Sequence, residues 1–177
     1  MGLLFSRKAR YNILILGLDN AGKTTLIRFM SKKPPHAETI PTAGFSVEKV
    51  MLDNIVADAW DVGGQESFRN LWQHYYESAS CVIFVIDATD KDRLQDAIDS
   101  IKSVVEQPLL AGRPFQVLLN KMDLDNTVTT KEVSEAIGSF FVQGKVKYCI
   151  MAVSAKTGEG CPEAINWLKN SLKKSSA

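Results

Sequence analysis

Short apolar runs recur along the chain, and each has the length of one buried strand rather than that of a helix. The runs predicted to form strands lie at residues 13–16, 81–86, 115–119 and 146–152. Residues 45–52 alternate with period two instead, Asp53-Asn54 fits a two-residue turn, and residues 55–60 return. This segment is therefore predicted to form a β-hairpin.

Helical spacing of apolar residues separates most of these strands, over residues 26–30 and 94–105. A further helix is predicted after Thr129-x-x-Glu132, which resembles a capping box, and a last one at Pro162, which fits a first helical position. The residues expected to face inward on these last two helices are Val133, Ala136, Ile137, Ile165, Leu168 and Leu172.

Strands that alternate with helices predict an α/β fold with a doubly wound, mainly parallel six-stranded sheet flanked by helices. The hairpin strand is expected to lie antiparallel at one edge. The polar motifs below directly follow predicted strands, so we expect them to meet in the crevice at the carboxyl ends of the strands, where such sheets bind ligands.

Composition narrows the class of protein. A chain of 177 residues is predicted to form a single domain, and its net charge of +1 argues against a general nucleic-acid binder. The longest apolar run, residues 81–86, is too short to span a membrane, and no secretory signal is visible. Three cysteines without a C-x-x-C pair suit a reducing compartment.

The strongest motif is Gly17-x-x-x-x-Gly22-Lys23-Thr24, which stands between a predicted strand and a predicted helix. Glycines at both ends allow a tight turn whose backbone N–H groups converge on one point, and the following helix directs its positive end there. Lys23 would contact β- and γ-phosphates, and Thr24 would offer its hydroxyl to Mg²⁺. The motif therefore predicts a nucleotide phosphate site.

Two further segments carry residues that suit this chemistry. In Asp61-x-Gly-Gly64-Gln65, the carboxylate can hold Mg²⁺ through water, the Gly64 N–H can meet a γ-phosphate, and Gln65 can orient an attacking water. Thr42 can reach the metal ion only if the proline-containing loop before it closes over the phosphates.

The choice of base rests on Asn120-Lys121-x-Asp123, at the end of a predicted strand. A carboxylate accepts two N–H bonds from the Watson–Crick edge of guanine, whereas adenine presents an acceptor there. Lys121 can cover the ring with its stem. In Ser154-Ala155-Lys156, the Ala155 N–H is expected to meet the guanine carbonyl oxygen.

The N-terminus fits a lipidation pattern, Met1-Gly2-x-x-x-Ser6, in which Gly2 would be myristoylated. Apolar residues 3–5 and the basic residues at 7, 8 and 10 lie beside it, and one acyl chain needs such a second signal to anchor stably. Residues 1–10 are predicted to be a membrane-attachment segment and residues 11–177 the nucleotide-binding domain. An unmodified, frayed N-terminus is the alternative.

Over essentially the whole chain these motifs resemble the Ras-like small GTPases with a P-loop, and in particular the Arf and Arf-like branch. The Arf features are Gly17-Leu-Asp-Asn-Ala-Gly-Lys-Thr-Thr25, Pro41-Thr-x-Gly-Phe45, Trp60-Asp-Val-Gly-Gly-Gln65 and Gly2. Within that branch, segments such as Arg69-Asn-Leu-Trp-x-His-Tyr-Tyr76 are similar to the sixth, ciliary Arf-like group linked to Bardet–Biedl syndrome.

The resemblance implies a monomeric GDP/GTP switch with Mg²⁺ and slow intrinsic hydrolysis, in which Gln65, Lys23 and Thr42 are catalytic. It implies that the metal site is formed by Thr24, Thr42 and, through water, Asp61. It implies nucleotide contacts from Asp19, Asn20, Ala21, Gly22, Lys23, Thr24, Thr25, Thr42, Gly64, Asn120, Lys121, Asp123, Ser154, Ala155 and Lys156.

The partners implied are an exchange factor, a GTPase-activating protein that supplies an arginine, and effectors that read Phe45, Trp60 and Tyr75. Core packing is an equally good interpretation of Trp60. The implied location is cytoplasmic with reversible attachment to Golgi, endomembrane or ciliary-base membranes, in vesicular or ciliary protein trafficking. The alternative function is a binding module that holds nucleotide without hydrolysing it.

Overall fold

The computed structural model describes residues 10–33 and 42–175. In that part of the chain a six-stranded sheet forms the centre of the molecule, with strand order β2-β3-β1-β4-β5-β6. The strands are β1 (Tyr11–Leu16), β2 (Phe45–Leu52), β3 (Ile55–Val62), β4 (Cys81–Asp87), β5 (Phe115–Asn120) and β6 (Tyr148–Ala152). Neighbouring strands are parallel except for β2 and β3. The predicted mainly parallel sheet with an antiparallel edge strand is confirmed.

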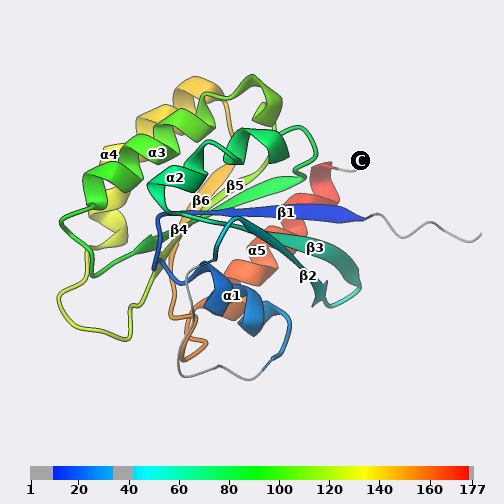
Figure 1. Cartoon of the computed structure of the whole chain (residues 1–177), viewed down its shortest axis with the longest axis horizontal. Coiled ribbons are helices and arrows are strands. Elements are labelled where there is room, and N and C mark those ends of the chain that lie inside the picture. The colour runs from blue at the N-terminus through cyan, green and yellow to red at the C-terminus, as the bar shows by residue number, and fades with distance from the viewer. Residues whose placement is uncertain (1–9, 34–41, 176–177) are drawn as a thin grey trace, which may run out of the picture.

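Helices cover both faces of the sheet (Figure 1). They are α1 (Lys23–Met30), α2 (Glu66–Arg69), α3 (Leu94–Val105), α4 (Thr130–Gly144) and α5 (Cys161–Ser175), with 3-10 turns at Trp72–Tyr75 and Pro108–Leu110. Because side chains alternate along β1, Leu14 and Leu16 pack toward α3 and α4, whereas Ile13 and Ile15 pack toward α1 and α5. The sheet therefore has a buried core on each face.

Two details of helix α4 and strand β6 differ from the predictions. Ala136 was expected to face inward but is exposed, and the buried face of α4 consists of Val133, Ile137 and Phe141. Strand β6 begins at Tyr148 rather than at residue 146, because the N–H of Val146 donates to Phe141 and closes the helix. The capping box at the start of α4 is confirmed, since Thr129 and Glu132 bond reciprocally.

The hairpin of β2 and β3 turns at Asp53, whose φ of 55° lies in the left-handed region. The Asp53 carboxylate forms an ion pair with Lys169 of α5. The predicted two-residue turn at Asp53 and Asn54 is confirmed, because the two strands end at Leu52 and begin again at Ile55.

Strands β3, β1, β4, β5 and β6 run in one direction, so their carboxyl ends share one edge of the sheet. The polar motifs follow these ends: Gly17 after β1, Asp87 and Asn120 as the last residues of β4 and β5, and Ser154 shortly after β6. A crevice at this edge is where open α/β sheets bind ligands.

Candidate functional site

The loop between β1 and α1 requires glycine at both of its ends. A Cβ on Gly17, whose φ is 143°, would lie 2.2 Å from the carbonyl oxygen of Val85. One on Gly22, whose φ is 94°, would lie 2.2 Å from Nδ2 of Asn120. Among the described residues, no side chain caps the N-terminus of helix α1 that follows, so its first N–H groups remain available to an anion.

Lys23 is the buried cation of this loop, with a relative exposure of 6%. Its ammonium donates to the carbonyl oxygens of Gly17 at 3.0 Å and Leu18 at 2.8 Å. Burial lowers the pKa of Lys23 to about 8, although the carboxylates of Asp61 and Asp19 act against this shift. A positive charge is thus held in a cradle of backbone groups, as a phosphate site needs.

Three side chains that carry oxygen atoms come from separate segments and meet beside the loop. The Thr24 hydroxyl lies 2.5 Å from Oδ2 of Asp61, and the Thr42 hydroxyl lies 3.0 Å from the same oxygen. The two hydroxyls lie 3.1 Å apart. The other oxygen of Asp61, Oδ1, is buried without a hydrogen-bond partner among the described residues. The structure therefore brings together the three residues for which the sequence indicated a metal site.

The segment after β3 packs tightly against the phosphate loop. A Cβ on Gly64 would lie 2.3 Å from the carbonyl oxygen of Gly17, so only glycine allows this approach. The Gly63 N–H donates to Gly44 at 2.8 Å, and the guanidinium Nε of Arg69 donates to the carbonyl oxygen of Gly64 at 3.2 Å. Gln65 follows as an exposed residue just before helix α2.

Asn120 connects the phosphate loop with the loop after β6. It is buried, and its amide donates to the carbonyl oxygen of Ala21 and accepts the N–H of Ala155, both at 2.9 Å. The Ala155 N–H was expected on a guanine carbonyl oxygen, but in the structure it already has Asn120 as its acceptor. Contact with a base would require this N–H to be shared.

The remaining residues of the base motifs form ion pairs and hydrogen bonds with neighbours. The Lys121 ammonium lies 2.6 Å from Oδ2 of Asp87, and the Ser154 hydroxyl donates to Oδ1 of Asp123 at 2.7 Å. Burial alone would raise the pKa of Asp87, but hydrogen bonds from Lys121 and Thr89 outweigh it, and the pKa falls below its ordinary value.

Three of the residues predicted to contact the nucleotide are less buried than the core of the site. Asn20 and Lys156 are exposed, and Thr25 is half-buried on α1. Asn20 has a φ of 61°, so the phosphate loop passes through the left-handed region here. Gly2, the predicted lipidation site, lies outside the described residues.

The three aromatic residues predicted to bind effectors touch one another. The rings of Phe45 and Tyr75 stack with centroids 4.5 Å apart, and Trp60 meets both edge-on, at 6.2 Å and 5.8 Å. Trp60 and Tyr75 also pack against the core, while Phe45 is 38% exposed. Trp60 therefore contributes to the core and to the aromatic cluster alike.

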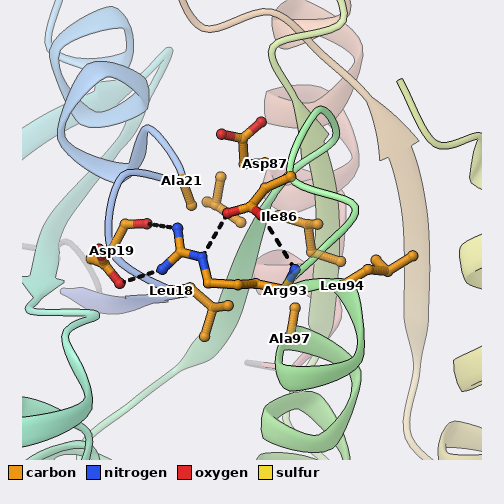
Figure 2. A pocket seen from close by; sticks show the side chains of 10 residues that line it. Leu18, Asp19, Ala21, Ile86, Asp87, Arg93, Leu94 and Ala97 are labelled. Atoms are coloured by element: carbon orange, nitrogen blue, oxygen red, sulfur yellow. Dashed lines mark hydrogen bonds and ion pairs between the residues drawn. The ribbon is translucent and has the colours of Figure 1, made fainter. Parts of the chain in front are cut away.

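Sequence reasoning missed two arginines and one aspartate of the site: Arg69, Arg93 and Asp87. Figure 2 shows Arg93 beside Asp19 of the phosphate loop, with two hydrogen bonds between them. The signal available in the sequence was an acidic residue inside a phosphate-binding loop, which requires a counter-ion from elsewhere. Asp90-x-x-Arg93, four residues after a predicted strand, has the spacing of a local ion pair.

Comparisons with known proteins agree with this geometry. A profile of the ADP-ribosylation factor family matches residues 1–172. ADP-ribosylation factor-like protein 1 of Drosophila melanogaster is 41% identical over 171 residues, 97% of this chain and 93% of that protein. ADP-ribosylation factor K of Dictyostelium discoideum is 38% identical over 169 residues, 96% of this chain and 89% of that protein.

A solved structure is similar throughout. It is that of the Arl6 BBS3 small GTPase from Trypanosoma brucei with the bound nucleotide analogue GppNp. The TM-score is 0.84 at 29% sequence identity, and the match covers 94% of this chain and 99% of the other.

Proposed function

The chain belongs to the ADP-ribosylation factor family of small GTPases, which bind GTP and GDP and hydrolyse GTP, and from this we propose how its own residues perform that activity. Residues 17–24 receive the β- and γ-phosphates, Asp123 recognises guanine, and Thr42 distinguishes GTP from GDP. The chain acts as a switch whose GTP form recruits effectors to a membrane.

The observation that carries this proposal is the convergence of Thr24, Thr42 and Asp61. Thr24 closes the phosphate-loop motif, Thr42 follows the proline-containing loop, and Asp61 is the next-to-last residue of β3, yet their oxygens lie within 3.1 Å of one another. A residue of a distant loop that reaches the phosphate site gives that loop a way to respond to the γ-phosphate.

The same three residues suit Mg²⁺. A carboxylate and two hydroxyls are the hard oxygen ligands that this ion prefers. The buried Oδ1 of Asp61 has no hydrogen-bond partner among the described residues, which in a native protein calls for an ion or a water. We assign Thr24, Thr42 and, through water, Asp61 to the ion, which would neutralise charge on the β- and γ-phosphates.

The hydrolytic roles follow from position. Lys23 places its ammonium in the phosphate cradle, and the Gly64 N–H lies on a segment that packs closely against Gly17. Gln65, exposed and next to Gly64, is free to orient an attacking water. A GTPase-activating partner is expected to add an arginine, because Arg93 is engaged by Asp19 and Arg69 by Gly64.

Single-turnover release of γ-phosphate tests the assignment of Gln65. We expect Gln65→Leu to retain GTP binding but to lose hydrolysis, because it removes the polar group that positions the water. Gln73→Leu, on an exposed glutamine of the nearby 3-10 turn, is the matched control. Unchanged hydrolysis in Gln65→Leu would contradict the role of Gln65, and absence of hydrolysis in the wild type would favour the non-hydrolysing binding module.

We further propose that effectors bind the cluster of Phe45, Trp60 and Tyr75, whose exposed member, Phe45, lies on edge strand β2. We also propose to which branch of the family the chain belongs. The similarity to the Arl6 BBS3 structure supports our proposal of the ciliary Arf-like group, and a pull-down comparing Gln65→Leu with the GDP form would identify the effectors. Capture of effectors from another trafficking route, without ciliary ones, would contradict that branch.

Membrane attachment is proposed for residues 1–10. None of the described helices is long and apolar enough to cross a bilayer. A myristoyl chain on Gly2 alone would give a binding constant of about 10⁴ M⁻¹, and each basic residue near it would add about 1 kcal/mol on an anionic leaflet. We expect GTP-dependent flotation with anionic liposomes that weakens with salt. Equal flotation of the GDP and GTP forms would contradict coupling between nucleotide and membrane.

A further inference from the structure

Arg93 makes a two-point contact with the phosphate loop, from a position 74 residues away in the sequence. One guanidinium nitrogen lies 2.7 Å from Oδ1 of Asp19, and another donates to the backbone carbonyl oxygen of the same residue at 3.2 Å. The contact therefore fixes both the side chain and the backbone of Asp19 (Figure 2).

A carboxylate at Asp19 creates an electrostatic problem for the site. It lies two residues after Gly17 and four before Lys23, in the loop that is to hold phosphates. Its charge reaches the cradle, because it acts to raise the pKa of Lys23. Like charges repel, so a freely moving Asp19 would weaken the binding of an anionic nucleotide.

Asp90 holds Arg93 in place. Nε of the guanidinium donates to Oδ2 of Asp90 at 2.7 Å, and the Arg93 backbone N–H donates to Oδ1 at 3.3 Å. The hydrogen bonds that Arg93 donates, to Asp90 first and to Asp19 as well, raise the pKa of Arg93 above its ordinary value. The arginine thus has one anchor on the segment before α3 and one partner in the phosphate loop.

The space beside this group is too small for a ligand. The cavity between the phosphate loop and α3 has a volume of about 10 Å³, which is room for about one water molecule. Its walls include Leu18, Asp19, Arg93 and Ala97 (Figure 2). The cluster is thus a connection between two parts of the protein and not a binding site of its own.

We propose that Arg93 is a positioning residue of the nucleotide site: it holds the Asp19 carboxylate against the segment before α3 and so keeps this negative charge away from the bound phosphates. Asp90 aligns the guanidinium for that purpose. The inference rests on the proposed assignment of residues 17–24 to the phosphates, and it adds the reason why an acidic residue is compatible with that role.

A double-mutant cycle tests the inference through the dissociation rate of fluorescent GDP in Mg²⁺. Arg93→Met keeps much of the side-chain volume but removes the charge, and we expect GDP to dissociate about tenfold faster. The effect should shrink as salt rises, because it is repulsion between charges. Adding Asp19→Asn to Arg93→Met should bring the GDP dissociation rate most of the way back to the wild-type value, since the repelling charge is then gone.

Arg113→Met, on an exposed arginine before β5, is the matched control and should leave the rate unchanged. If Arg93→Met does not fold, as judged by its circular dichroism, Arg93→Lys replaces it. Asp19→Asn should then slow GDP release more in that background than in the wild type. A wild-type rate in Arg93→Met, or no rescue by Asp19→Asn, would overturn the inference. Failure of the wild type to bind GDP would instead overturn the nucleotide assignment.

Discussion

The two ends of the crevice are built in opposite ways. At the phosphate end, Asp61 has a buried carboxylate oxygen with no hydrogen-bond partner in the part of the chain that the structure describes, and Lys23 is a buried cation whose pKa is lowered to about 8. At the base end, the side-chain amide of Asn120 both donates and accepts, and Lys121 and Ser154 each bond an aspartate. Among the described residues, the phosphate end thus keeps one buried oxygen without a partner, whereas the side chains named at the base end all bond to neighbours.

This difference assigns the two ends different tasks. A buried oxygen without a partner among the described residues and a buried cation of lowered pKa change their interactions strongly when charge arrives, which suits a part that senses whether a γ-phosphate is present. Groups already fixed by neighbours are pre-organised, which suits a part that recognises one base at little entropic cost. We therefore infer that the state of the switch is read at the phosphate end and that the base end holds the nucleotide in both states.

The largest expected effect concerns the base end. Asp123→Asn should weaken GDP by about two to four decades, because two charge-assisted bonds at about 1.5–3 kcal/mol each are replaced by a mismatched amide. Xanthosine diphosphate, whose edge offers an acceptor, should bind better to the variant than to the wild type. Equilibrium titration with fluorescent nucleotides measures both.

Asp125→Asn is the control for that change, because Asp125 is an exposed aspartate two residues away. It should leave the preference for guanine intact. Unchanged GDP affinity in Asp123→Asn would remove Asp123 from base recognition and would leave the internal bonding of this end without a role in specificity.

A smaller effect is expected from pH at the phosphate end. Phosphate oxygens favour the charged form of Lys23, so nucleotide binding raises its pKa from about 8 and takes up a proton above that pH. Affinity for GDP should fall about tenfold between pH 7 and pH 9. Calorimetry in buffers of different ionisation enthalpy measures the proton uptake directly.

The free energy of unfolding should also depend on pH through Lys23, but it should rise with pH, whereas the affinity for GDP falls. The unfolded chain, with an ordinary lysine pKa of 10.5, binds more protons than the folded protein between about pH 8 and 10.5, so the contribution of Lys23 to stability rises with pH there. Lys23→Arg, which stays charged, should lose both dependences. If the affinity of Lys23→Arg for GDP still fell between pH 7 and pH 9, another group would be the cause of the pH dependence.

The smallest predicted effect is the most selective. Thr42→Ala removes a hydroxyl within 3.1 Å of Thr24 and 3.0 Å of Asp61, and loss of such an interaction costs about 1 kcal/mol. GTP affinity should fall about fivefold, while GDP affinity stays constant. Ser46→Ala, on an exposed residue of β2, is the control. Equal loss for both nucleotides would show that Thr42 does not distinguish them.

Much of the fold and of the site was predictable from local patterns. The hairpin turn at Asp53 and the capping box at Thr129 depend on neighbouring residues alone, and the structure has them as expected. The approach of Thr24 to Asp61 was predictable as well, because parallel strands place their carboxyl ends and the segments that follow them at one edge. The position of Thr42 could be stated only as a condition on the loop before it, because Thr42 precedes the antiparallel edge strand β2.

Other features depend on contacts that no local pattern reveals. The pairing of Arg93 with Asp19 arises only when the segment after β4 lies beside the phosphate loop, and in sequence Arg93 belongs to an ordinary charged stretch. The bond from Ala155 to Asn120 likewise depends on how the loop after β6 packs. The exposure of Ala136, one residue before the buried Ile137, also depends on how α4 packs on its neighbours.

Amide hydrogen exchange on the GDP form and on the form with a non-hydrolysable GTP analogue tests the central comparison most directly. Peptides around Thr42 and Gly64 should become more protected with the GTP analogue, while peptides around Asn120 and Ala155 should exchange at the same rate in both forms. Equal exchange at Thr42 and Gly64, or a change confined to Asn120 and Ala155, would contradict the assignment of sensing to the phosphate end.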